Sequence, residues 1–138
     1  MAGYSGTPLP QKLGIKPGHA VAVLHPPDRF AETLGRLPEN AVLRKFAASG
    51  SSPLDVIIAF VRRRSELEKH LPSIRRRMAQ AGGLWVAWPK KASGVATDMT
   101  EDVVRAVALP TGLVDNKVCA IDDTWSGLRL VIRLENRR

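Results

Sequence analysis

The stretch Gly82-Gly83-Leu84-Trp85-Val86-Ala87-Trp88-Pro89-Lys90-Lys91 decides the fold that this sequence predicts. Two glycines end a preceding helical pattern, five apolar residues are typical of a buried strand, and a proline and two lysines follow. In open α/β sheets, ligands bind at the carboxyl ends of parallel strands. The stretch therefore predicts a parallel sheet and also the edge of that sheet at which a ligand binds.

The rest of the chain alternates strands with helices. Short apolar runs bounded by turn residues predict further strands over residues 20–24, 41–43, 54–61, 114–121 and 128–134. Apolar periodicity predicts helices over residues 28–37, 65–78 and 102–109. This order is typical of an α/β fold: a mostly parallel, Rossmann-like sheet with helices on both faces and a C-terminal antiparallel hairpin. Residues 1–18, rich in proline and glycine, are predicted to be an arm or loop, and residues 19–138 a single domain.

Capping residues predict where the helices begin. Asp28 precedes the first helix, and Ser65 with Glu68 matches a capping box before the second. Asp98 with Glu101 is a similar signal before the third helix.

Composition excludes several classes of protein. The chain of 138 residues has no run of eighteen apolar residues, and its first residues do not resemble a secretory signal. The single cysteine, Cys119, cannot form an internal disulfide, which predicts a cytoplasmic location. One cysteine and three histidines predict no metal site. The net charge of +8 favours encounter with anions, namely a small molecule, an acidic protein or nucleic acid.

Charged residues follow the predicted strands where ligands bind. Right-handed crossovers bring the carboxyl ends of parallel strands to one edge, so we expect His25, Arg62, Lys90 and Asp122 to share that edge. Lys90 and Lys91, before the flexible Ser93-Gly94 loop, predict an anion site. His25 is a candidate acid–base group, although a structural role is favoured for it. Asp122 could act as a base or a metal ligand, although turn formation is favoured.

Tryptophans and arginines add to this edge. Trp85 is predicted to pack in the core, Trp88 to line a pocket, and Trp125, in the hairpin loop, to cover the site. The basic runs 62–64 and 75–77 suit contacts with the phosphate backbone of a nucleic acid. No aromatic residues interleave with these runs to stack on bases, so a solvated helix face is the favoured interpretation. The predicted ligand-binding residues are His25, Arg62, Trp88, Lys90, Lys91, Asp122 and Trp125.

The sequence resembles two families. Residues 2–9, 83–91, 109–117 and 125–129 resemble those of a small bacterial family, common in actinobacteria and known as a domain of unknown function. That resemblance covers nearly the whole chain and implies no activity. Residues 55–61, the following helix, Gly82-Gly83, the next strand and the terminal hairpin resemble the second half of class I S-adenosylmethionine-dependent methyltransferases.

The methyltransferase resemblance implies a cofactor site that the sequence does not reproduce. In that family a glycine-rich loop after the first strand holds the cofactor, and an acidic residue ends the second strand. Here residues 25–28 read His-Pro-Pro-Asp, and Arg44 and Lys45 stand where the acidic residue is expected. These departures predict that no cofactor is bound. The leading hypothesis is therefore a cytoplasmic, non-catalytic binding or regulatory module for an anionic ligand or partner.

Two alternatives remain open. One is a divergent S-adenosylmethionine-dependent methyltransferase that uses His25 or Asp122. The other is a nucleic-acid-binding protein, whose affinity would fall steeply with salt concentration.

Overall fold

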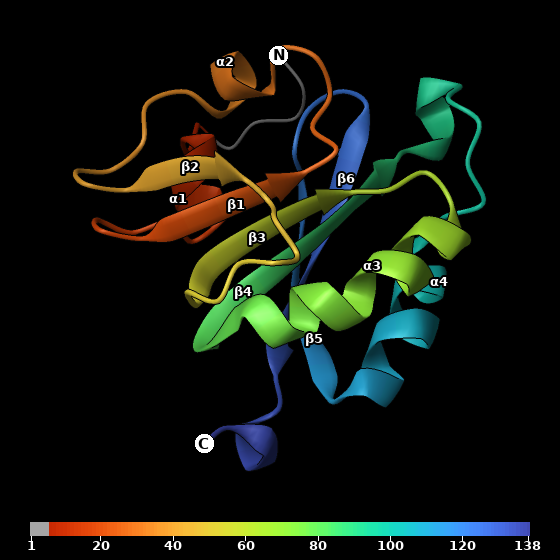
Figure 1. The fold of residues 1–138 in the computed structure, drawn as a ribbon. Coiled ribbons are helices and arrows are strands. Elements are labelled where there is room, and N and C mark those ends of the chain that lie inside the picture. The colour runs from red at the N-terminus through yellow and green to blue at the C-terminus, as the bar shows by residue number, and fades with distance from the viewer. Residues whose placement is uncertain (1–5) are drawn as a thin grey trace.

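A six-stranded sheet in the order β2-β1-β3-β4-β6-β5 forms the centre of the computed structural model, which describes residues 6–138 (Figure 1). The strands are β1 (Ala20–Leu24), β2 (Val42–Lys45), β3 (Leu54–Phe60), β4 (Met78–Pro89), β5 (Leu113–Ala120) and β6 (Trp125–Ile132). The helices are α1 (Leu9–Lys12), α2 (Phe30–Leu34), α3 (Arg64–Arg77) and α4 (Glu101–Ala108), with short 3-10 turns η1 (Lys91–Ser93), η2 (Leu109–Thr111) and η3 (Leu134–Asn136).

The directions of the strands confirm the predicted sheet. β2, β1, β3 and β4 run parallel, whereas β6 pairs antiparallel with both β4 and β5. The sheet is therefore mostly parallel and ends in an antiparallel C-terminal hairpin. Its helices are few and short, because only α3 spans more than eight residues.

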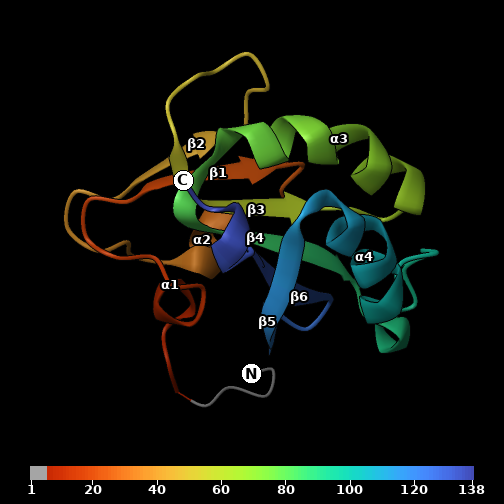
Figure 2. The ribbon, with the colours of Figure 1, turned by 90° about the horizontal axis from the view of Figure 1, so that it is seen from below.

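Apolar side chains pack on both faces of the sheet. Leu67, Leu71 and Ile74 of α3 pack with Leu84 of β4 on the face that α3 and α4 cover. On the opposite face, buried side chains of α2 and of residues 13–15 pack with Trp85. Figure 2 shows α3 on one side of the sheet and α1 and α2 on the other. The alternation of side chains along each strand produces these two cores.

The two glycines that were expected to end a helix lie inside a strand. α3 ends at Arg77, and β4 begins at the next residue, so Gly82 and Gly83 belong to β4. A Cβ at Gly82 would lie 2.9 Å from the carbonyl oxygen of Leu54, and one at Gly83 would lie 2.7 Å from Nε of Arg129. Gly82 therefore suits glycine because neighbouring backbone approaches closely, not because the chain must leave a helix. At Gly83 the close neighbour is the side chain of Arg129 from β6.

The predicted start of the helix over residues 28–37 is wrong. α2 begins at Phe30, and the residue before it, Arg29, has the left-handed φ of 61°. No side chain caps α2, so Asp28 does not take the capping role that its position suggested. The helix also ends at Leu34, three residues earlier than the pattern predicted.

Asp98 serves a different helix from the one that its position indicated. Its Oδ1 accepts a hydrogen bond of 2.7 Å from the backbone N–H of Arg64, at the start of α3. α4 is capped instead by Thr100, whose Oγ1 accepts from the N–H of Val103 at 3.1 Å. Asp98 thus ties the segment before α4 to the beginning of α3.

The N-terminal segment closes one face of the sheet. Residues 1–5 of the expected arm lie outside the described residues, but Leu13 and Ile15 are buried in the core. The indole Nε1 of Trp85 donates a hydrogen bond of 2.9 Å to the carbonyl of Leu13. The prediction that Trp85 packs in the core is confirmed. Among the described residues, none of the helices has the length and apolar character that crossing a membrane requires.

Replacing Trp85 should separate its packing from its hydrogen bond. We expect Trp85→Ala to lower the free energy of unfolding by about 3–5 kcal/mol, because a large buried ring is removed. Trp85→Phe should cost roughly 1–3 kcal/mol, because most of the packing stays while the buried Leu13 carbonyl loses its donor. Urea denaturation followed by circular dichroism measures both values.

The exposed Val118 offers a control for these variants, since Val118→Ala should change stability by less than about 0.5 kcal/mol. A Trp85→Phe variant as unstable as Trp85→Ala would contradict the separate role of the indole N–H.

Candidate functional site

A pocket lies where the strand order reverses. The chain passes from β1 outward to β2 on one side and from β3 outward to β4 on the other, so β1 and β3 flank the switch point. Ligands of open α/β sheets bind in the crevice outside the carboxyl ends at such a point. A pocket of about 260 Å³, called here the switch-point pocket, is found there. It is lined by His25, Pro26, Pro27, Phe60, Arg62, Glu66 and Trp125.

Glu66 holds the first turn of α3 and faces the switch-point pocket. Its Oε1 accepts hydrogen bonds from the backbone N–H groups of Arg62 at 3.0 Å and Arg63 at 3.1 Å. This fixes the carboxylate at the third residue of the helix, where it satisfies backbone donors that have no partner within the helix. The capping box predicted from Ser65 and Glu68 is therefore wrong, because α3 begins at Arg64.

His25 lies opposite the second oxygen of this carboxylate. Its Nδ1 is 3.6 Å from Oε2 of Glu66, and half of its side chain is exposed to solvent. The backbone of His25 has a left-handed φ of 52°, which is uncommon for a residue other than glycine. Such backbone conformations gather at functional sites, where surrounding structure holds them. The sequence indicated His25, but nothing in its pattern identified Glu66 as its partner.

His70 is a second histidine at this site. It lies four residues after Glu66, so both side chains project from the same face of α3. The rings of His25 and His70 meet edge to face, with centroids 5.2 Å apart. Burial lowers the pKa of His70, and the neighbouring His25 and Lys69 lower it further.

Aromatic rings form the wall beside these groups. Phe60 packs edge to face with Phe30 and with Trp125, each at a centroid distance of 5.0 Å. The guanidinium carbon of Arg62 lies 5.8 Å from the centre of the Trp125 ring, which is the range of a cation–π contact. Trp125 was expected in the hairpin loop. It is instead the buried first residue of β6, paired with Pro89.

Lys90 and Asp122 lie at the same edge but build the β5–β6 turn. The Nζ of Lys90 donates to the carbonyl of Asp122 at 2.8 Å, and its N–H donates to the carbonyl of Thr124 at 2.7 Å. Oδ1 of Asp122 accepts from the N–H groups of Thr124 and Trp125, each at 2.8 Å. Neither residue lines the switch-point pocket. The turn-forming alternative thus describes Asp122.

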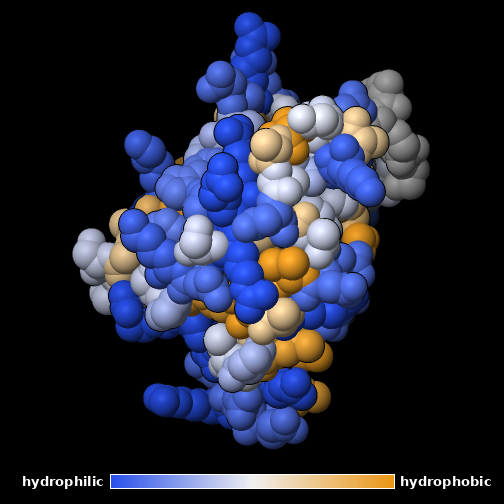
Figure 3. All heavy atoms as spheres, turned by 90° about the vertical axis from the view of Figure 1, so that its right-hand side faces the viewer, coloured by the Kyte–Doolittle hydropathy of each residue, from blue (hydrophilic) through white to orange (hydrophobic). Residues whose placement is uncertain are grey.

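The remaining two predicted residues also lie outside the switch-point pocket. Lys91 is exposed at the start of η1. Trp88 is buried with Met99 in the core on the α3 and α4 side of the sheet, so its ring does not line this pocket. Figure 3 faces the edge where the parallel strands end and shows mostly hydrophilic side chains with small hydrophobic groups between them.

The pocket therefore brings together His25, Arg62 and Trp125 from the predicted set and adds Glu66. His70 packs against His25 without lining the pocket. A histidine beside a fixed carboxylate can accept a proton from a substrate, and the carboxylate stabilises the imidazolium that forms. Within residues 6–138, no three side chains of the metal-ligating kinds are grouped closely enough to hold a metal ion.

Comparison with known structures identifies the fold. The chain is similar to a S-adenosylmethionine-dependent methyltransferase from Aquifex aeolicus, with a TM-score of 0.60 and 14% identity over 88% of this chain and 87% of that one. A putative type 11 methyltransferase from Sulfolobus solfataricus gives a TM-score of 0.66 and 12% identity over 94% and 92%. Fibrillarin from Aeropyrum pernix, which contains natively bound S-adenosyl-L-methionine, gives a TM-score of 0.56 and 15% identity over 94% and 70%.

These neighbours correct the expectation of a non-catalytic binding or regulatory module. Named methyltransferases recur among the similar structures, and they favour the methyltransferase alternative over that module. No protein-family model matches the sequence, and no curated protein matches it. The fold of the chain is that of class I S-adenosylmethionine-dependent methyltransferases.

Proposed function

We propose that the protein is a divergent S-adenosylmethionine-dependent methyltransferase and that its reaction takes place at the switch-point pocket. The observation that carries the proposal is the pair formed by His25 and Glu66 at the switch point of a methyltransferase-like sheet. A fold alone does not specify an activity. Here, however, a group that can accept a proton lies where ligands of such sheets bind, and this supports an enzymatic activity.

The role of His25 follows from the chemistry of the acceptor. When an oxygen or nitrogen of the acceptor gains a methyl group, it loses the proton that it carried. Nε2 of neutral His25 would take that proton, and Oε2 of Glu66, 3.6 Å from Nδ1, would stabilise the charged ring. The two backbone bonds to Oε1 keep the carboxylate in place while the charge on the ring changes.

The side chains of the pocket fit one half of the cofactor, which supplies the methyl group when it is bound. The guanidinium of Arg62 suits the carboxylate of its amino-acid end, and the Trp125 ring suits its sulfonium cation. The turn after β1 does not reproduce the glycine loop, since Pro26 and Pro27 have no N–H to donate. The pocket of about 260 Å³ is also smaller than most ligand pockets. We therefore expect binding weaker than a complete cofactor site provides.

Calorimetry with S-adenosylmethionine and with S-adenosylhomocysteine tests the proposal. We expect dissociation constants between the micromolar and the millimolar range, with the sulfonium compound bound more tightly because of the Trp125 ring. Arg62→Ala should weaken both by about tenfold, or 1.4 kcal/mol.

Arg36→Ala is the matched control, because Arg36 is an exposed arginine that does not line the pocket. Absence of heat at millimolar concentrations of both compounds would contradict the proposal. So would an equal loss of affinity in the two arginine variants.

An NMR titration tests the electrostatic contact between the two histidines. His70 should titrate below its ordinary pKa of 6.5, because burial and His25 both disfavour its charged form. His25→Gln should raise the pKa of His70 without restoring 6.5, since burial remains. Because the folded state lowers this pKa, the contribution of His70 to stability is present above pH 6.5 and is lost as the pH falls below it.

His19→Gln serves as the control for this titration, because the ring of His19 accepts a hydrogen bond from Lys16 at another part of the fold. An unchanged His70 pKa in His25→Gln would show that the two rings do not interact in solution.

Three expectations from the sequence stay predictions. They are membership of the actinobacterial family, a cytoplasmic location, and the salt-dependent binding of nucleic acid as an alternative activity.

A further inference from the structure

A second hollow lies under the connection between β2 and β3. Residues 46–53 join these two parallel strands without a helix, crossing β1 on the side of the sheet that carries α3 (Figure 2). Crossovers between parallel strands usually contain a helix that covers the sheet. Here a cavity of about 480 Å³ remains between the connection and the sheet, within the range of small-molecule pockets. It is called here the β2 hollow.

The sheet side of the β2 hollow is apolar. Ala20 and Ala22 of β1, Leu54 of β3 and Val42 of β2 line it. Val42 leaves 45% of its surface exposed, which makes it one of the few large apolar residues that face solvent in the described chain. An apolar body placed there would remove this surface from water.

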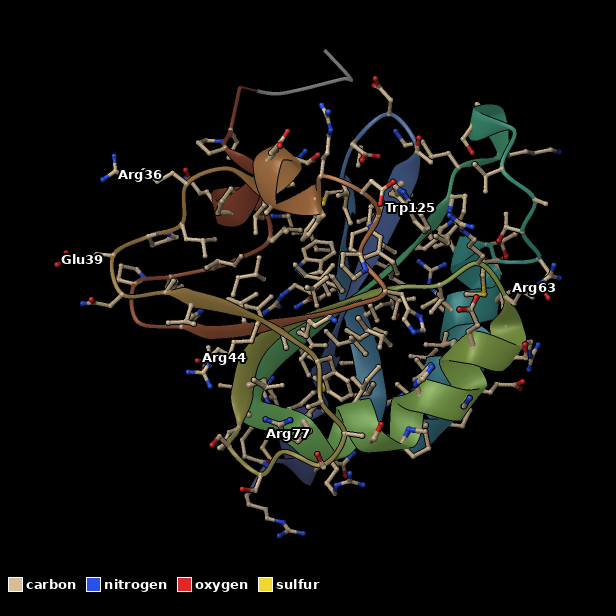
Figure 4. All side chains as sticks on the ribbon, turned by 45° about the horizontal axis from the view of Figure 1, so that its top comes forward. Arg36, Glu39, Arg44, Arg63, Arg77 and Trp125 are labelled. Carbon is tan, nitrogen blue, oxygen red and sulfur yellow. The ribbon has the colours of Figure 1, made fainter. Side chains whose placement is uncertain are left out.

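The other side of the β2 hollow carries a buried positive charge. Arg77, the last residue of α3, is 8% exposed, and Figure 4 shows it beside the β2–β3 connection. Its Nη1 donates to the carbonyl of Ala47, and its Nε and Nη2 donate to the carbonyl of Ser52 at 3.2 and 2.9 Å. Within residues 6–138, Arg77 forms no ion pair with a carboxylate. Carbonyl groups accept three hydrogen bonds from its five N–H groups, but they supply no counter-charge to the guanidinium.

Further cationic residues surround the same space. Arg44 and Lys45 of β2 line the hollow, and none of its lining residues in the described chain is an aspartate or a glutamate. Helix α3 also holds the β2–β3 connection in place over the hollow, because Nη2 of Arg76 donates a hydrogen bond to the carbonyl of Ala48 at 2.8 Å. The cavity is thus preformed, apolar on one side and positively charged on the other.

We propose that the β2 hollow binds a small organic anion. Its phosphate or carboxylate would lie against Arg44 and Arg77, and its apolar body would lie on Val42 and the two alanines. The hollow is lined by the beginnings of β1 and β3, whereas the switch-point pocket lies beyond their carboxyl ends. The proposal therefore goes beyond the methyltransferase activity and does not depend on it.

Backbone amide NMR of the full chain, titrated with phenyl phosphate, tests this assignment. We expect saturable shifts at the amides of Ala20, Ala22 and Val42. Benzoate should shift the same amides if a carboxylate serves as well as a phosphate. Inorganic phosphate, which lacks the apolar body, and benzyl alcohol, which lacks the charge, should each bind at least about tenfold more weakly than phenyl phosphate.

Arg44→Ala should weaken the binding of phenyl phosphate by about tenfold, whereas Arg36→Ala, an exposed arginine outside the hollow, should leave it unchanged. Arg77 is kept in the test protein because it holds the β2–β3 connection. Equal losses in the two variants, or shifts that do not saturate, would show non-specific attraction and overturn the proposal. Shifts confined to the Trp125 indole would place the anion in the switch-point pocket and overturn it as well.

Discussion

The register of the parallel strands is the constraint on which the candidate site depends. Leu24 at the end of β1 lies opposite Ala59 of β3, and Phe60 lies opposite Ala87 of β4. The strands therefore end at nearly the same level, and the residues that follow them meet at one edge. A slip of one residue would turn the side chains of a strand to the other face of the sheet. The apolar packing on both faces prevents such a slip and so fixes the chemistry at the edge.

Glu66 shows how closely the stability of the fold and the geometry of the site are joined. One carboxylate oxygen satisfies two backbone N–H groups at the start of α3, and the other faces His25. The helix start, with its partial positive charge, favours a carboxylate at this position even without a ligand. The orientation of His25 is therefore supported by an interaction that the helix already needs.

The sequence predicts the sheet well because its strands are short apolar runs between turn residues. It also predicts His25, Arg62 and Trp125 at one edge, since topology alone brings strand ends together. The sequence does not predict where the helices start, because the side chains that accept hydrogen bonds from their first N–H groups can lie far away in the chain. Asp98, for example, accepts from a backbone N–H thirty-four residues earlier. Glu66 was overlooked because the residue before α3 is an arginine, which carries no capping signal. Lys90 and Asp122 were predicted to bind a ligand but stabilise a turn. The sequence alone does not distinguish a lysine or an aspartate in a turn from one that binds a ligand.

The hydrogen bond from the Trp85 indole to Leu13 also has a consequence for the order in which the chain folds. The two residues are separated by 72 positions, and the indole N–H is the one polar group of that side chain. During synthesis Leu13 leaves the ribosome long before Trp85, yet its place in the core exists only after β4 has emerged. Leu13 and the residues next to it must therefore wait in solvent until that strand has been made. Their docking belongs to the late steps of folding.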